Sequence, residues 1–216
     1  MHEVGHNLGF AHSGDGTDEY ADKSGHMGLS SRYQAKKCFN GHKSWQSGWY
    51  ADRHATWTPF GVSSREYKLV GAIDYASSGE ENVVVLKLDT LGRIDYYVNF
   101  NRRSGSNSRT VYGDKVLITS ARNDRYLRLR PYADSTLKAK LGAGETYSIP
   151  DTDLNVTVVA IDFISSPAVA TVCVSSADSS CEANNSTASP TESSITTNSS
   201  TVCPRLDPFV TTTFRF

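Results

Sequence analysis

The residues best suited to chemistry lie in the segment HEVGHNLGFAH, which begins at His2. On a helix, residues i and i+4 lie one above the other, so His2 and His6 can direct two imidazole nitrogens at a point about 2 Å from each, the length of a zinc–nitrogen bond. Glu3 is rotated away from that face and cannot be a ligand there. It is instead placed to hold a metal-bound water, and the three residues together predict a metal site.

A turn after this helix is predicted to supply a third ligand. Gly9 follows His6 by three residues, where a residue able to adopt φ > 0 can end the helix and reverse the chain. The reversal brings His12 back to the metal and leaves the fourth tetrahedral position to water. Three His, one Glu and one Gly at fixed offsets arise by chance about 10⁻⁷ times per position. We therefore interpret the segment as a site for one Zn²⁺ ion.

The remaining histidines lack a partner at ligand spacing and lie among polar or turn residues, so we do not predict them to bind metal; they are His26, His42 and His54.

The site segment resembles the extended signature HExxHxxGxxH of the metzincin zinc endopeptidases. The finer resemblance is to the gametolysin family of metzincins and covers about residues 2–175. Four stretches carry it: HEVGHNLG (2–9), YADKSGHMG (20–28), CFNGHKSWQSGWY (38–50) and YYVNFNRRSGSNSRT (96–110).

The resemblance implies a metalloendopeptidase that uses Zn²⁺ and hydrolyses peptide bonds. It assigns the zinc ligands to His2, His6 and His12, the general base to Glu3, and a methionine-containing turn beneath the metal to Met27. Some metzincins have a tyrosine ligand two residues after that methionine. This sequence has Leu29 there, so no such ligand is expected.

Residues 66–174 have a different pattern of residue types from the site segment. Short β-branched and aromatic runs alternate with Gly, Asn, Asp and Ser clusters, which is typical of antiparallel strands in a sandwich or barrel. The runs are VVVLKLD (83–89), IDYYVNF (94–100), DKVLITS (114–120), YLRLR (126–130), NVTVVAIDF (155–163) and AVATVCV (168–174).

We therefore predict an α+β chain in four parts. Residues 1–58 are the C-terminal part of a metzincin catalytic domain, with an active-site helix, a Met-turn and a short helix within residues 40–50. Residues 59–174 are an all-β antiparallel sandwich-like domain. From 175 to 201, 15 of 27 residues are Ser or Thr, so 175–202 is predicted to be a disordered stalk. Residues 203–216 are a short tail of unknown structure.

The position of the signature in the chain creates a further expectation. In metzincins an N-terminal subdomain with a twisted sheet precedes the active-site helix, whereas here the signature begins at residue 2. We therefore interpret the chain as the C-terminal part of a protease and expect the missing subdomain and a signal peptide to lie upstream. On this interpretation the first 55 residues lack the sheet that orients their ligands.

Several features favour an extracellular or cell-wall location. The four cysteines are too scattered for a zinc pattern, so disulfides are expected; Cys173 and Cys181 can close a small loop, and the partner of Cys38 is expected upstream. Four Asn-x-Ser/Thr sequons predict N-glycosylation, at Asn155, Asn184, Asn185 and Asn198. The expected partner is therefore a protein substrate, an extracellular matrix or cell-wall glycoprotein.

Composition argues against other classes of partner. The net charge of −1 creates no field that attracts nucleic acid, and no apolar run is long enough to be a transmembrane segment. One alternative function stays open at this point. The chain could be a non-catalytic glycosylated surface protein, a β-sandwich on a stalk with a relic zinc motif.

Overall fold

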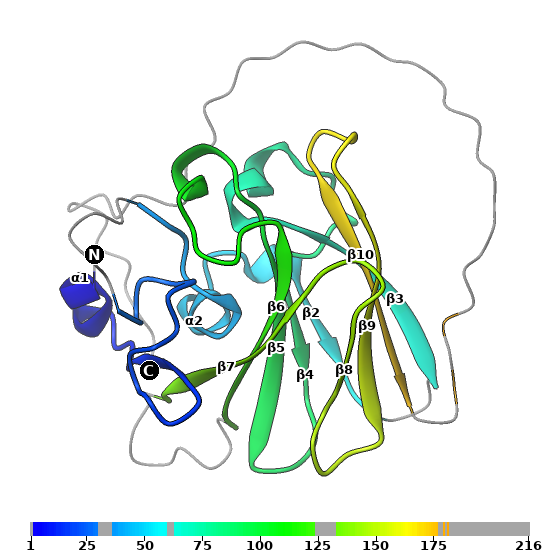
Figure 1. Cartoon of the computed structure of the whole chain (residues 1–216), viewed down its shortest axis with the longest axis horizontal. Helices are drawn as coiled ribbons and strands as arrows, with labels where there is room; N and C mark the ends of the chain where they lie inside the picture. Colours follow the sequence, from blue (N-terminus) through cyan, green and yellow to red (C-terminus); the bar gives the residue numbers. More distant parts are fainter. Residues whose placement is uncertain are drawn as a thin grey trace.

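The fold is built mostly of strands, with few helices. A computed structural model describes residues 2–29, 36–59, 63–123, 133–176, 179 and 181. Its helices are α1 (His2–Asn7) and α2 (Gly41–Ser47), with short 3-10 helices η1 (Ala51–Arg53), η2 (Ala72–Ser77) and η3 (Gly105–Asn107). Two β-sheets lie face to face, and the N-terminal segment lies beside one of them (Figure 1). The broad α+β prediction is therefore confirmed.

The larger sheet has six strands in the order β1-β7-β6-β5-β4-β2. Its four central strands are antiparallel, but β1 pairs in parallel with β7 and β2 in parallel with β4. The sheet is thus mixed, but among the named strands within residues 59–174 every pairing is antiparallel, as predicted. The strands are β1 (Ser13–Asp15), β2 (His54–Trp57), β4 (Val85–Leu88), β5 (Ile94–Asn101), β6 (Lys115–Arg122) and β7 (Ser135–Leu141).

Both parallel outer strands come from the first 58 residues. This sheet therefore crosses the predicted boundary between residues 58 and 59, and the division into two domains stays a prediction. A parallel pair cannot be closed by a tight hairpin, so each outer strand reaches its partner through a long stretch of chain. The N-terminal segment consequently frames the sheet at both edges.

The smaller sheet is antiparallel, in the order β3-β10-β9-β8, and closes the sandwich. Alternate residues of the facing strands point into one shared core; Val98 and Ile118 from one sheet meet Val156 and Val172 from the other, all fully buried. Burial of this core is the main source of stability for the sandwich. The strands are β3 (Ser64–Val70), β8 (Thr146–Ser148), β9 (Leu154–Asp162) and β10 (Val169–Ser176).

Helix α2 covers the outer face of the six-stranded sheet (Figure 1). Asn40 caps its N-terminus by accepting a 3.0 Å hydrogen bond from the Lys43 backbone N–H. Gly48 ends it in the left-handed conformation, with φ of 69°. The short helix predicted within residues 40–50 is therefore present. Trp45 and Trp49 are half-buried against the sheet's outer cluster.

Some predictions fall outside the described residues. These are the strand run 126–130, the stalk beyond residue 181, the tail 203–216 and the sequons Asn184, Asn185 and Asn198. Strand β10 continues to Ser176, which is two residues into the predicted stalk.

Candidate metal centre

Helix α1 is short, and a glycine turn ends it. The backbone N–H of Gly9 donates to the carbonyl of His6 at 2.9 Å, and that of Phe10 donates to the carbonyl of Gly5 at 2.9 Å. Gly9 itself has a φ of 83°. This pair of bonds is a Schellman motif, which a glycine in the left-handed region closes without a Cβ clash. The turn sends the chain back past the end of α1 toward His12.

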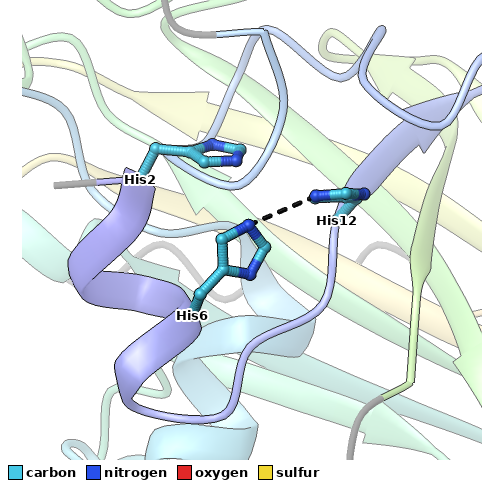
Figure 2. A group of neighbouring side chains, drawn as sticks. All are labelled: His2, His6 and His12. Carbon is cyan, nitrogen blue, oxygen red and sulfur yellow. Dashed lines mark hydrogen bonds between the residues drawn. The ribbon is translucent and has the colours of Figure 1, made fainter.

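The reversal brings three imidazoles together (Figure 2). His2, His6 and His12 each offer one nitrogen, and these nitrogens all lie within 4.8 Å of one another. Among the described residues this is the one group of three or more His, Cys, Asp or Glu that could hold a metal ion. The Nε2 atoms of His6 and His12 are 3.2 Å apart. Two ligands of a tetrahedral zinc ion lie about 3.4 Å apart, so this spacing fits a shared ion.

In two of these rings the other nitrogen, Nδ1, has a hydrogen-bond partner in the backbone. His2 Nδ1 lies 2.9 Å from the carbonyl oxygen of His26, and His6 Nδ1 lies 2.8 Å from that of Phe10. A carbonyl oxygen only accepts, so each Nδ1 carries the proton and each neutral ring keeps a lone pair on Nε2. These lone pairs face the centre of the cluster, where a cation would satisfy them.

His12 is flanked by two residues that sequence patterns did not select. Its Nδ1 lies 3.7 Å from a carboxylate oxygen of Glu19. The ring of Tyr20 lies 4.1 Å from the His12 ring, measured between centroids. The pKa of Tyr20 is raised, first by partial desolvation and then by the negative charges of Glu19 and Glu3. Glu3 lies on α1 between His2 and His6, and its side chain is exposed.

The floor beneath α1 is apolar. Met27 is fully buried and packs with Phe10 and Phe39, with Trp49 at the margin. A Cβ added to Gly5 would lie 2.2 Å from the Met27 sulfur, so the helix rests directly on this methionine. The glycine in the HEVGH motif is thus the residue that permits the close approach.

The backbone of His12 is tied to the large sheet. The N–H of Ser135 donates to the His12 carbonyl at 3.1 Å, and the next residue, Ser13, begins β1 in register with Ser135. The hydroxyls of Ser13 and Ser135 are also 2.8 Å apart and buried. The third histidine is therefore held at the edge of a sheet that the described chain itself provides.

The other histidines do not join the cluster. Burial, reinforced by the charge of Lys37, lowers the pKa of His26 to about 4, so its ring is neutral. His42 is completely buried and its pKa is also lowered by burial. His54 stacks on Trp45 with 4.3 Å between ring centroids. The contribution of His26 is instead its backbone carbonyl, which holds His2.

The cysteines and the described sequon are not part of the histidine cluster. Cys173 and Cys181 form a disulfide, as predicted. Cys38 is also disulfide-bonded, which corrects the expectation that its partner lies upstream. Asn155 is half-buried on β9, and its side-chain oxygen accepts a 2.6 Å hydrogen bond from Ser148. In the described residues, no helix combines the length and apolar character needed to cross a bilayer.

Comparison with known proteins adds one finding to this geometry. The family model "Gametolysin peptidase M11" matches residues 1–83, a stretch that contains all three clustered histidines, Glu3 and Met27. No curated protein and no solved structure matches the chain. That family implies a metal-dependent peptidase, and residues 1–83 of the chain are similar to the gametolysin peptidases.

Proposed function

We propose that this protein is a zinc-dependent endopeptidase that hydrolyses peptide bonds in extracellular or cell-wall glycoproteins. The observation that carries the proposal is the convergence of three imidazoles, two of which have their Nδ1 committed to backbone carbonyls. That arrangement leaves nitrogen lone pairs for a borderline-soft cation such as Zn²⁺, which prefers imidazole ligands in tetrahedral geometry.

In this mechanism His2, His6 and His12 hold the ion through their free ring nitrogens. The bound zinc supplies Lewis acidity, which makes water a stronger nucleophile and polarises the peptide carbonyl. Glu3 accepts the proton of the attacking water and later passes it to the nitrogen of the leaving amine as the C–N bond breaks. The exposed position of Glu3 leaves its carboxylate accessible to water and substrate.

The proposed substrate class and location draw on the cysteines and the sequons. The disulfide-bonded cysteines Cys38, Cys173 and Cys181 fit an oxidising compartment, and the sequons fit a glycoprotein. Detection of the protein in culture medium or wall extracts, with a mass above 23.6 kDa that falls after deglycosylation, would support this location. Retention in the cytosol with reduced cysteines would contradict it.

The metal assignment can be tested on the 216-residue chain. We expect the chelator-stripped protein to bind one zinc per chain, and His12→Ala to weaken binding at least 100-fold because one ligand is lost. Glu66→Gln, an exposed substitution on β3, is the control and should leave affinity unchanged. An unchanged zinc affinity in His12→Ala would refute the three-histidine site.

The role of Glu3 needs a separate experiment. Glu3→Gln should retain zinc but lower the cleavage rate of a denatured protein substrate by about 10²–10⁴-fold, because the proton carrier is gone. Zinc content by elemental analysis and cleavage with and without chelator measure the two effects. A Glu3→Gln protein as active as the unaltered chain would exclude Glu3 as the general base.

A further inference from the structure

A buried carboxylate lies where the loop beneath the metal centre meets the large sheet. Asp22 is fully buried and follows the Tyr20 that packs on His12. One of its carboxylate oxygens accepts hydrogen bonds from the Ser24 backbone N–H at 2.9 Å and the Ser24 hydroxyl at 2.5 Å. The other accepts from the Asn40 side-chain amide at 2.9 Å. Both carboxylate oxygens of Asp22 therefore accept hydrogen bonds.

Asn40 extends this contact to three further elements. Its amide nitrogen also lies 3.1 Å from the Ser13 hydroxyl on β1 and 3.2 Å from the Ser135 hydroxyl on β7. Its amide oxygen caps α2 by accepting from the Lys43 backbone. A single carboxylate–amide pair thus joins the 22–28 loop, the neighbouring strands β1 and β7, and the start of a helix.

The same loop holds two of the metal-binding histidines. The N–H of Asp22 donates to the Ser13 carbonyl at 3.2 Å, and the N–H of Ser13 donates to the Met27 carbonyl at 2.9 Å. These two bonds fix the chain immediately after His12. Four residues beyond Asp22, the carbonyl of His26 accepts from His2. A shift of the loop would therefore move His2 and His12 relative to each other.

The charge of Asp22 is balanced from the same side of the molecule. The ammonium groups of Lys37 and Lys43 are both strongly buried, and the charge of Asp22 opposes the lowering of their pKa values by burial. Lys37 Nζ is itself held by the carbonyl of Lys23, next to Asp22 in the chain, at 3.0 Å. A buried anion that has both cations and hydrogen-bond donors around it keeps a defined position.

We propose that Asp22 is a positioning residue for the metal centre: through Ser24, Asn40 and Ser13 it sets the distance between His2 and His12 and so the affinity for the ion. The inference rests on the proposed function because it requires the histidine cluster to bind metal. Residues outside the ligand set that orient ligands typically change metal affinity by about 10–100-fold when they are replaced.

An exchange of side chains isolates this contact. In Asp22→Asn the new amide NH₂ faces either the Asn40 NH₂ or the Ser24 N–H, so a donor meets a donor in both orientations. In the double variant Asp22→Asn/Asn40→Asp the amide of residue 22 donates to the carboxylate of residue 40. That carboxylate can still cap α2, and the Ser13 and Ser135 hydroxyls can rotate to donate to it.

The readouts are Zn²⁺ affinity by chelator competition, the visible spectrum of bound Co²⁺, which reports ligand geometry, and thermal unfolding without metal. We expect Asp22→Asn to bind Zn²⁺ at least tenfold more weakly with an altered Co²⁺ spectrum, and the affinity of the double variant to return within about threefold of that of the unaltered chain.

The matched control is Asp95→Asn. Asp95 is equally buried and accepts from the Asn123 amide at 2.9 Å, but it lies in the large sheet away from the centre. The Asp95→Asn substitution should lower the unfolding temperature and leave metal affinity unchanged.

Three outcomes would overturn the proposal: unchanged affinity in Asp22→Asn, failure of the exchange to restore affinity in a stable double variant, or an equal loss of affinity in Asp95→Asn. If Asp22→Asn does not fold, Ser24→Ala removes one donor alone and should weaken affinity in the same direction, and unchanged affinity there would also refute the role. His12→Ala separates the two hypotheses. If His12→Ala leaves metal affinity unchanged, the metal site itself is wrong. If His12→Ala lowers metal affinity but Asp22→Asn does not, only the role of Asp22 is refuted.

Discussion

The contact between Gly5 and Met27 allows a quantitative test of how α1 is supported. In Gly5→Ala the new Cβ would lie 2.2 Å from the Met27 sulfur, whereas Cβ contacts below 3.0 Å essentially do not occur. The sulfur or the helix must therefore move by at least 0.8 Å, the difference between 3.0 and 2.2 Å. Met27 is completely buried, so the displacement disturbs packed neighbours.

Two opposing effects determine the size of the change. Overpacking of a close-packed core costs about 1–3 kcal/mol, and replacing Gly by Ala inside a helix contributes about 1 kcal/mol in the favourable direction. The net strain of up to about 2 kcal/mol falls on the helix that carries His2 and His6. Because 2 kcal/mol corresponds to a factor of about 30, we expect zinc affinity to fall by up to that factor.

Chelator competition measures the affinity, and thermal unfolding without metal measures stability. Gly5→Ala/Met27→Ala should show less than additive losses, because the shorter side chain removes the overlap. Gly92→Ala is a control, since its new Cβ would meet only the Thr90 hydroxyl, at 3.2 Å. Gly5→Ala with unchanged zinc affinity and a raised unfolding temperature would show that α1 does not rest on Met27.

Three further predictions concern stability. At free zinc about 100 times its dissociation constant, binding should stabilise the chain by about 2.7 kcal/mol, so a chelator should lower the unfolding temperature by several degrees; no shift would contradict specific binding to the folded state. Leu86→Ala, in the centre of the sandwich core, should cost about 2–5 kcal/mol in urea unfolding while leaving zinc affinity unchanged. Burial lowers the pKa of Lys43 to about 7 from an ordinary 10.5, so between these values the unfolded chain binds more protons and this group makes stability rise with pH. Lys43→Met should reduce that rise between pH 7 and 10, measured by urea unfolding, and leave the part that comes from Lys37, whose pKa burial lowers to about 8; a rise of the same size in the variant would exclude Lys43 as a source.

The site was predictable where its chemistry depends on residue type at short range. Spacing along one turn of helix predicted that His2 and His6 lie together, and a chain reversal at Gly9 predicted that His12 joins them; the three imidazoles do converge. The acceptors that orient His2 and His6 are backbone carbonyls, of His26 and Phe10. Every residue has such a carbonyl, so no residue type marks these two. They follow from the path of the folded chain.

The same distinction applies to the fold. Alternating apolar residues predicted strands such as β5 and β10, because period-two burial leaves a direct trace in the sequence. Strand β1 is only Ser-Gly-Asp and has no such trace. The strand forms because Ser13 pairs with Ser135, which lies in β7, 122 positions further along the chain. Local propensity does not encode such a tertiary contact.

The parallel outer strands have a consequence for any attempt to produce the β-rich region by itself. A protein cut between residues 58 and 59 would lose β1 and β2 and expose the backbone donors and acceptors of β7 and β4. The β4 edge carries Val85, Leu86 and Leu88, all completely buried in the intact chain. Open apolar edges of this kind pair with other chains and favour aggregation. Such a fragment should therefore self-associate, whereas the chain that begins before His2 keeps both edges covered.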